Sequence, residues 1–218
     1  MAMNPIAKRT ISALTTAALV VLAIIYAPTN WMRPVFAVLI ALVFFEFCLL
    51  LKKRLGGFRF VFAALVGLVV LCLLGALPAI AVEYGNLMML YVIAIIKISD
   101  MGGFAAGVST AKLMVGGNHK MCPTISPNKS WEGLAGSVAA SCILSCCFMP
   151  ITHFVWYKAL AFGVTAAFVG TFGDLVESKF KRWVGVKDSS TFMPAGMGGL
   201  LDMFDSLLFA PAVLLPFI

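Results

Sequence analysis

Seven apolar runs, each about the length of a membrane span, constrain the fold of this 218-residue chain more than any other feature. A transmembrane helix needs about 20 predominantly apolar residues, and in lipid its backbone polar groups must pair within the segment. Apolar residues make up 62% of the chain and charged residues 11%, which excludes an ordinary soluble domain. The sequence therefore predicts an all-α polytopic integral membrane protein. The runs cover about residues 10–26, 34–51, 60–82, 87–107, 133–154, 159–176 and 198–217.

Lysine and arginine residues fall almost entirely on one side of the predicted membrane. If the N-terminus is cytoplasmic, thirteen of them face the cytoplasm, and only Arg33 and Lys158 face the other side. Because cytoplasmic loops carry an excess of Lys and Arg, this bias predicts seven spans with the N-terminus inside and the C-terminus outside. The polar segments 108–132 and 179–197 then both face the cytoplasm. The same bias accounts for the net charge of +7, so no nucleic-acid partner is expected.

Carboxylates are concentrated where the last two apolar runs meet a basic linker. Five of the nine acids lie there: Asp174, Glu177, Asp188, Asp202 and Asp205. Asp202 and Asp205 are three residues apart, so they share one face of a helix. Two like charges at this spacing repel each other unless something positive lies between them. Lys187 or Arg182 of the linker could fill that place, but a divalent cation suits oxygen ligands better.

Helix capping is the alternative explanation for this pair. Acids are favoured near a helix N-terminus, where the helix dipole is positive. That effect explains Asp202, but it explains less well a second acid, Asp205, one turn deeper. Metal binding is therefore the favoured interpretation of the spacing.

The linker before these two acids carries groups suited to phosphate. Asp174 and Glu177 repeat the spacing of three, and a basic stretch from Lys179 to Lys187 follows directly. Gly198 and Gly199 open the last run, so backbone N–H groups there can approach a phosphate. Carboxylates for a metal beside a basic, glycine-containing loop are typical of phosphate chemistry. Taken alone, the basic stretch is better explained as a solvated face touching anionic lipid.

Three further ionisable residues lie inside apolar runs, where such residues are costly. Lys97 and Asp100 are three residues apart on one helix face and could simply pair with each other. Glu46 stands alone in the second run and is not predicted to be catalytic.

A turn followed by a helix N-terminus is predicted over residues 126–133. Ser130 is the expected N-cap, and Glu132 lies in the first turn. Capping does not explain Lys129 and Trp131, which stand beside these residues at the membrane interface.

Three blocks of this sequence carry most of its polar residues outside the first runs. They are 97–104 (KISDMGGF), 123–133 (PTISPNKSWEG) and 178–206, which contains SKFKR, KD and GGLLDMFDS. Together these blocks resemble the CDP-diacylglycerol synthases (phosphatidate cytidylyltransferases). Their order and spacing match over about residues 90–210, whereas the first runs share only hydropathy with that family. The chain departs from the usual pattern at Met197, where the family has His, at Met203, where it has Arg, and at Val108, where it has Arg or Lys.

The resemblance implies that CTP and phosphatidic acid react to give CDP-diacylglycerol and pyrophosphate in phospholipid biosynthesis. It implies Mg²⁺ as cofactor, with room for a second cation, and it leaves a homodimer open. We expect N-terminal transmembrane helices over 1–85 and a catalytic region over 86–218, with cytoplasmic loops at 108–132 and 179–197. The expected location is a bacterial inner membrane, with the active site facing the cytoplasm.

Residue roles are assigned from the three blocks and, for Asp174, from its spacing beside the basic stretch. The catalytic candidates are Asp174, Lys187, Asp188, Asp202 and Asp205. The metal-ligand candidates are Asp174, Asp202, Asp205 and Asp100. The substrate-binding candidates are Ser126, Lys129, Trp131, Glu132, Ser178, Lys181, Arg182, Gly198 and Gly199.

Two other functions remain open from the sequence. A CTP-dependent lipid-alcohol kinase would transfer the γ-phosphate and release CDP in place of pyrophosphate. A non-enzymatic membrane transporter would use the intramembrane acids to line an ion path, although these acids cluster at one interface and leave the bilayer midplane nearly clear.

Overall fold

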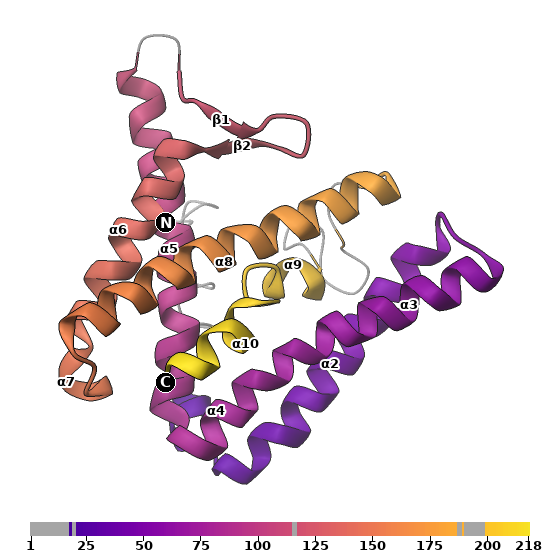
Figure 1. Cartoon of the computed structure of the whole chain (residues 1–218). Coiled ribbons are helices and arrows are strands. Elements are labelled where there is room, and N and C mark those ends of the chain that lie inside the picture. The colour runs from indigo at the N-terminus through magenta and orange to yellow at the C-terminus, as the bar shows by residue number, and fades with distance from the viewer. Residues whose placement is uncertain (1–17, 19–20, 115–116, 187–188, 190–198) are drawn as a thin grey trace, which may run out of the picture.

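The computed structural model describes residues 18, 21–114, 117–186, 189 and 199–218, and nearly all of this part is helical (Figure 1). The helices are α2 (Thr29–Lys52), α3 (Gly57–Cys72), α4 (Ala76–Tyr84), α5 (Asn86–Leu113), α6 (Trp131–Cys147), α7 (Met149–Thr152), α8 (Trp156–Val184), α9 (Leu200–Phe204) and α10 (Ala210–Leu214). Two 3-10 turns, η1 (Leu73–Gly75) and η2 (Leu215–Phe217), and two strands, β1 (Lys120–Cys122) and β2 (Ser126–Ser130), complete the set.

Four of the described helical segments are long and apolar enough to cross a membrane, which confirms the helical membrane class. α3, η1 and α4 together form one of these segments, and α6 is a shorter apolar helix. The run predicted at 10–26 lies mostly outside the described residues, so the number of seven spans and the orientation stay predictions. The four segments are Thr29–Lys52, Gly57–Tyr84, Asn86–Leu113 and Trp156–Val184.

The prediction of one continuous helix over residues 198–217 is wrong in the described part of that run. The chain there forms the short helix α9, a turn, α10 and η2. Pro211 lies in the first turn of α10, and Pro216 lies in the first turn of η2. Proline has no N–H and clashes with the carbonyl four residues earlier, so each one favours a helix start and interrupts a longer helix.

The predicted polar loop at 108–132 contains two β-strands, whereas the predicted fold class was all-α. α5 continues to Leu113, and β1 and β2 then pair as an antiparallel hairpin, with Lys120 opposite Ser130. The Trp131 N–H donates to the His119 carbonyl at 3.0 Å and joins this hairpin to the start of α6. The hairpin thereby places residues 126–130 beside α5 and α8.

Small residues allow α5 and α6 to pack with their backbones in close contact. A Cβ atom at Gly102 would overlap the Cβ of Ala140, and one at Gly136 would overlap the Cβ of Ala106. Such small-residue contacts are the usual means of helix association in membranes, where apolar side chains gain nothing by leaving lipid. The α5–α6 pair then packs on α8 (Figure 1).

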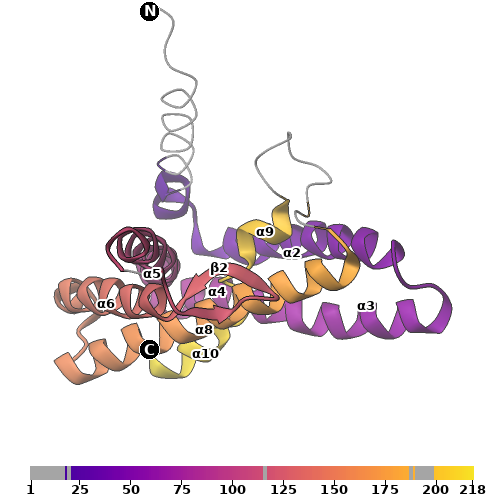
Figure 2. The same cartoon turned by 90° about the horizontal axis from the view of Figure 1, so that it is seen from above.

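Helix α9 lies between two larger parts of the structure. Figure 1 shows it between α8 and the hairpin formed by α2 and α3, and Figure 2 shows that it lies on the α2 side of that hairpin. Because α9 carries Asp202 and is followed by Asp205, this position places both acids among three membrane helices.

We expect Gly136→Leu to lower the free energy of unfolding by about 1–3 kcal/mol, because the added side chain overpacks the α5–α6 contact. Thermal unfolding of the detergent-solubilised protein measures this change. Ala139→Leu is the matched control, since Ala139 is exposed on the same helix. Equal melting temperatures for the two variants would contradict the packing described here.

Candidate active site

Asp202 is surrounded by hydrogen-bond donors. Its Oδ2 accepts from the Gly199 N–H at 2.9 Å and from the Ser189 N–H at 3.3 Å. Its Oδ1 accepts from the Ser189 hydroxyl at 2.8 Å and from the Lys181 ammonium at 3.1 Å. These donors and the charge of Lys181 stabilise the carboxylate form of Asp202. The capping explanation therefore holds for Asp202, and its role as a metal ligand stays a prediction.

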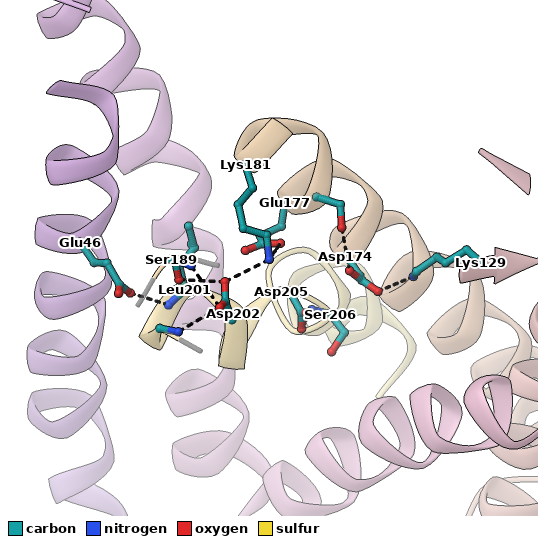
Figure 3. Close-up of polar contacts among 12 residues, drawn as sticks. Glu46, Lys129, Asp174, Glu177, Lys181, Ser189, Leu201, Asp202, Asp205 and Ser206 are labelled. Atoms are coloured by element: carbon teal, nitrogen blue, oxygen red, sulfur yellow. Dashed lines mark hydrogen bonds and ion pairs between the residues drawn. The ribbon is translucent and has the colours of Figure 1, made fainter. Parts of the chain in front are cut away.

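Lys181 links helix α8 to helix α9. Its ammonium lies 2.7 Å from Glu177 Oε2 and 3.1 Å from Asp202 Oδ1, with only 14% of its side chain exposed (Figure 3). The cation beside Asp202 is thus Lys181, whereas the sequence suggested Lys187 or Arg182. Two carboxyl groups already surround its ammonium. A contact of Lys181 with substrate stays a prediction.

Asp205 has a different basic partner from Asp202. Its Oδ1 lies 3.7 Å from the Lys97 ammonium of α5 and accepts from the Ser206 N–H at 2.6 Å. Lys97 also donates to the Met203 carbonyl at 3.1 Å and to the Ser206 hydroxyl at 2.9 Å. Lys97 therefore reaches from the first block to the third, and its interaction with Asp100 is electrostatic and longer-ranged.

Asp174 connects α8 to the hairpin. Its Oδ2 lies 2.6 Å from the Lys129 ammonium, and its Oδ1 accepts from the Ser178 hydroxyl at 3.3 Å. Lys129 also donates to the Thr171 carbonyl at 3.3 Å. Lys129 is therefore held against α8, which places the second block beside the acids.

A cavity of about 230 Å³ opens where α5, the hairpin, α6 and α8 meet. Asp100 lines it from α5, Ser126 and Lys129 from β2, and Asp174 from α8. Gly103 and Gly133 also lie on its wall, so the close α5–α6 packing shapes one side of it. Residues that are more than seventy positions apart in the sequence thus share one polar cavity.

Three of the predicted metal ligands lie within electrostatic range of one another. Asp205 interacts with Asp100 and Asp174, and Asp100 interacts with Asp174. Within the described residues, however, no three His, Cys, Asp or Glu side chains are close enough to hold a metal ion by themselves. Asp202 lies on the far side of Asp205 from Asp174 and contacts Lys181 (Figure 3). The structure therefore separates the four acids into a group of three and a single one.

The start of α6 agrees with the sequence prediction. The Ser130 hydroxyl accepts from the Gly133 N–H at 3.1 Å, as expected of an N-cap. Glu132 Oε1 lies 2.7 Å from Nδ1 of His119 and accepts from the His119 N–H at 3.1 Å, and the hydrogen bond to the ring is the main reason why the pKa of Glu132 falls to about 2. Glu132 thus holds the hairpin against the start of α6. The side chain of Trp131 is exposed.

The remaining predicted residues are distributed as follows. Arg182 is exposed on α8, and Gly199 is the N-cap of α9. The positions Lys187, Asp188 and Gly198, together with Met197, lie outside the described residues.

Glu46 is a functional candidate that the sequence prediction set aside. It is fully buried in α2, and its Oε2 accepts from the Leu201 N–H at 2.8 Å. A Cβ atom at Gly199 would overlap Glu46 Oε1 and the Ser189 hydroxyl, so a larger residue there would have to displace these side chains. The sequence did contain a signal for this role, because a carboxylate inside an apolar run needs a partner. Only the fold shows that this partner is the first turn of α9.

A family model described as the cytidylyltransferase family matches residues 1–218 of the chain. The chain belongs to the cytidylyltransferase family. This membership confirms the resemblance drawn from the three sequence blocks.

Curated relatives of this chain carry the name phosphatidate cytidylyltransferase. The relative from Mycobacterium bovis is 44% identical over 125 residues, which is 56% of this chain and 36% of the relative. The one from Mycobacterium tuberculosis is also 44% identical over 125 residues, or 34% of its length. The one from Staphylococcus aureus is 42% identical over 122 residues, which is 55% of this chain and 44% of the relative. The matched region therefore spans less than half the length of these relatives.

One departure from the usual family sequence lies where the described contacts do not involve the side chain. Met203 replaces an arginine, and its side chain is 45% exposed. Its carbonyl accepts from Lys97, a bond that does not depend on the side chain. The substitution therefore leaves the contacts of Asp202 and Asp205 in place.

We expect Glu46→Ala to destabilise the protein by about 1–3 kcal/mol, because the buried Leu201 N–H then has no acceptor. Catalytic activity should fall with it, since α9 carries the acids. Glu46→Gln keeps a side-chain oxygen at the same distance and should retain most of the stability and activity. Thermal unfolding and activity assays of both variants test this prediction. Equal losses of stability and activity in the two variants would show that the hydrogen bond to Leu201 does not support α9.

Proposed function

We propose that this chain transfers a cytidylyl group from CTP to phosphatidic acid, forming CDP-diacylglycerol and releasing pyrophosphate. The polar cavity carries the proposal, because it brings Asp100, Ser126, Lys129 and Asp174 together beside Asp205 in a helical membrane protein. Family membership and the names of the relatives support the same reaction.

The chemistry requires positioning and charge neutralisation more than a protein nucleophile. A phosphate oxygen of phosphatidic acid attacks the α-phosphorus of CTP and forms a new P–O bond. The bond from the α-phosphorus to the bridging oxygen breaks, and pyrophosphate leaves with the electron pair. Both substrates are anionic, so the basic residues around the acids lower the repulsion between them.

The residues of the cavity suit the triphosphate of CTP. Lys129 supplies a positive charge, and Ser126 supplies a hydroxyl on the same wall. Lys97 lies beside Asp205, whereas Lys181 lies beside Asp202. We assign nucleotide binding to Ser126 and Lys129, and a structural role in the hairpin to Glu132.

The acids fit a Mg²⁺ ion that is shared with the substrate. Mg²⁺ is usually bound by one or two carboxylates together with substrate phosphates and water, and an all-protein cage is not needed. Asp100, Asp174 and Asp205 offer hard oxygen donors near one another, which suits this mode. The family generally uses divalent cations. When bound, the ion would neutralise charge on the phosphates, while Lys97 and Lys129 hold the carboxylates in place.

The other end of the acid row suits the lipid phosphate. Lys181 and Asp202 form a fixed pair there, and Ser178 and Arg182 lie on the same helix. Lys187, Asp188 and Gly198 keep their proposed roles in catalysis and phosphate binding.

The topology is also part of the proposal. Seven spans, with the N-terminus inside and the C-terminus outside, place the two polar loops in the cytoplasm, where CTP is present. The catalytic region then begins at about residue 86, after the N-terminal helices. A bacterial inner membrane is the location that fits this topology, and a homodimer is compatible with it.

We expect Lys129→Met to raise the KM for CTP roughly ten- to hundredfold, because a hydrogen bond to a charged group contributes about 1.5–3 kcal/mol. Lys120→Met is the matched control, since Lys120 is an exposed lysine in the same hairpin. Steady-state kinetics with labelled CTP measure both variants. An unchanged KM for CTP in Lys129→Met would place the nucleotide elsewhere.

We expect Asp205→Asn to lower kcat about a hundredfold or more and to abolish its dependence on Mg²⁺, because a preorganised charge at the reacting phosphates is lost. The assay uses purified protein, phosphatidic acid and CTP labelled in the α- or the γ-phosphate. Label from the α-phosphate should appear in lipid and label from the γ-phosphate in pyrophosphate; release of CDP would indicate a kinase. Glu83→Gln, which changes an exposed acid on α4, is the control. Wild-type turnover by Asp205→Asn would contradict the assignment.

A further inference from the structure

A second hollow lies on the opposite side of the acids from the polar cavity. It is a groove of about 370 Å³ between the α2–α3 hairpin on one side and α8 and α9 on the other. Its walls are almost entirely apolar, and Glu177 is the only charged residue among those that line it in the described part of the chain. Phe62 and Val66 of α3 and Phe180 of α8 form much of its surface.

The groove is continuous with the candidate active site. Leu201 lines it, and the next residue is Asp202. Glu177 also lines it and is paired with Lys181 at 2.7 Å. One end of this apolar groove is therefore the polar group formed by Glu177, Lys181 and Asp202.

Helix α8 separates the groove from the polar cavity. Asp174 lines the cavity, whereas Glu177, three residues later, lines the groove. The labelled side chains follow this order in Figure 3, from Glu46 and Asp202 at one end to Asp174 and Lys129 at the other. A ligand in the groove and a ligand in the cavity would thus reach the acids from opposite sides.

The surroundings of the groove restrict what can fill it. α2, α3 and α8 all belong to segments long and apolar enough to span a membrane. The side chains of Phe62 and Val66 are 61% and 50% exposed, so the groove opens toward the medium that surrounds the helices. In a bilayer that medium is hydrocarbon, and an apolar slot beside a polar site selects a molecule with an apolar chain and a charged head.

We propose that this groove holds an acyl chain of the phosphatidic acid substrate, with the lipid phosphate at the Lys181–Asp202 end. The inference rests on the proposed function and adds the place of the lipid chain to it. CTP then occupies the cavity on the other side of α8, and the acids lie between the two substrates. The N-terminal helices α2 and α3 thereby become part of the substrate site.

Filling the groove tests the proposal. Val66→Trp places a large side chain in the groove, and Val69→Trp places the same side chain on the exposed outer face of α3. We expect Val66→Trp to raise the KM for dioleoyl phosphatidic acid roughly tenfold, as for loss of about two buried methylene groups. The KM for dihexanoyl phosphatidic acid and the KM for CTP should stay within about twofold, and Val69→Trp should resemble wild type. Equal changes for long and short chains would overturn the proposal.

Photocrosslinking gives a second test that does not depend on turnover or on the folding of a variant. Wild-type protein in vesicles is illuminated with phosphatidic acid that carries a diazirine on one acyl chain, without CTP. We expect labelled peptides from α3 and from the Phe180 region of α8, and weaker labelling by the same probe on phosphatidylglycerol. Equal labelling by the two lipids would show an unselective bilayer contact, and labelling elsewhere would exclude the groove; both overturn the proposal.

The two tests separate this inference from the proposed function. If wild-type protein does not convert CTP and phosphatidic acid, the proposed function fails, whereas selective crosslinking in the groove still reports lipid binding. If turnover is normal but crosslinking and chain-length selectivity do not involve the groove, only the inference fails. If a second copy of the chain filled the groove, Val66→Trp would form a smaller oligomer in native mass spectrometry while its lipid kinetics stayed unchanged. That result would also overturn the inference.

Discussion

The buried lysine between two carboxylates is the interaction on which the candidate site depends. Lys181 of α8 contacts Glu177 of its own helix and Asp202 of α9, and all three groups are largely removed from water. A buried charge is tolerated only when it is paired and hydrogen-bonded, so the position of each group fixes the position of the others. Glu46 adds a bond from α2 to the first turn of α9. A helix of five residues is thereby held by two longer ones.

This attachment places the acids between two hollows of opposite character. The polar cavity lies on the Asp174 side of α8, and the apolar groove lies on the Glu177 side. Each hollow depends on a different type of packing. Glycine contacts between α5 and α6 shape the cavity, whereas the groove forms where α2 and α3 stand beside α8. An enzyme that joins a nucleotide to a lipid needs both environments at one reacting centre.

Much of this site follows from local sequence patterns. The i, i+3 spacing and the three blocks pointed to Asp174, Asp202 and Asp205 as candidates, and to Ser130 as a helix cap. Pairings were predicted less well. A pair of Lys97 with its neighbour Asp100 was left open by the sequence, yet Lys97 contacts Asp205, more than a hundred residues away. Partners at that distance depend on helix packing, and helix packing in a membrane is decided by small residues that hydropathy does not register.

The sequence by itself determined the membrane class and the family, because these depend on composition and on local spacing, and it predicted residues suited to phosphate and metal chemistry. Only the tertiary structure decided that Asp202 is bound by Lys181 while Asp205 lies with Asp100 and Asp174. It also decided that Pro211 and Pro216 divide the last apolar run, and that Glu46 supports α9. The physical reason is the same in each case. A polar group in an apolar environment takes whichever partner the fold brings to it, and that partner lies far away in the chain.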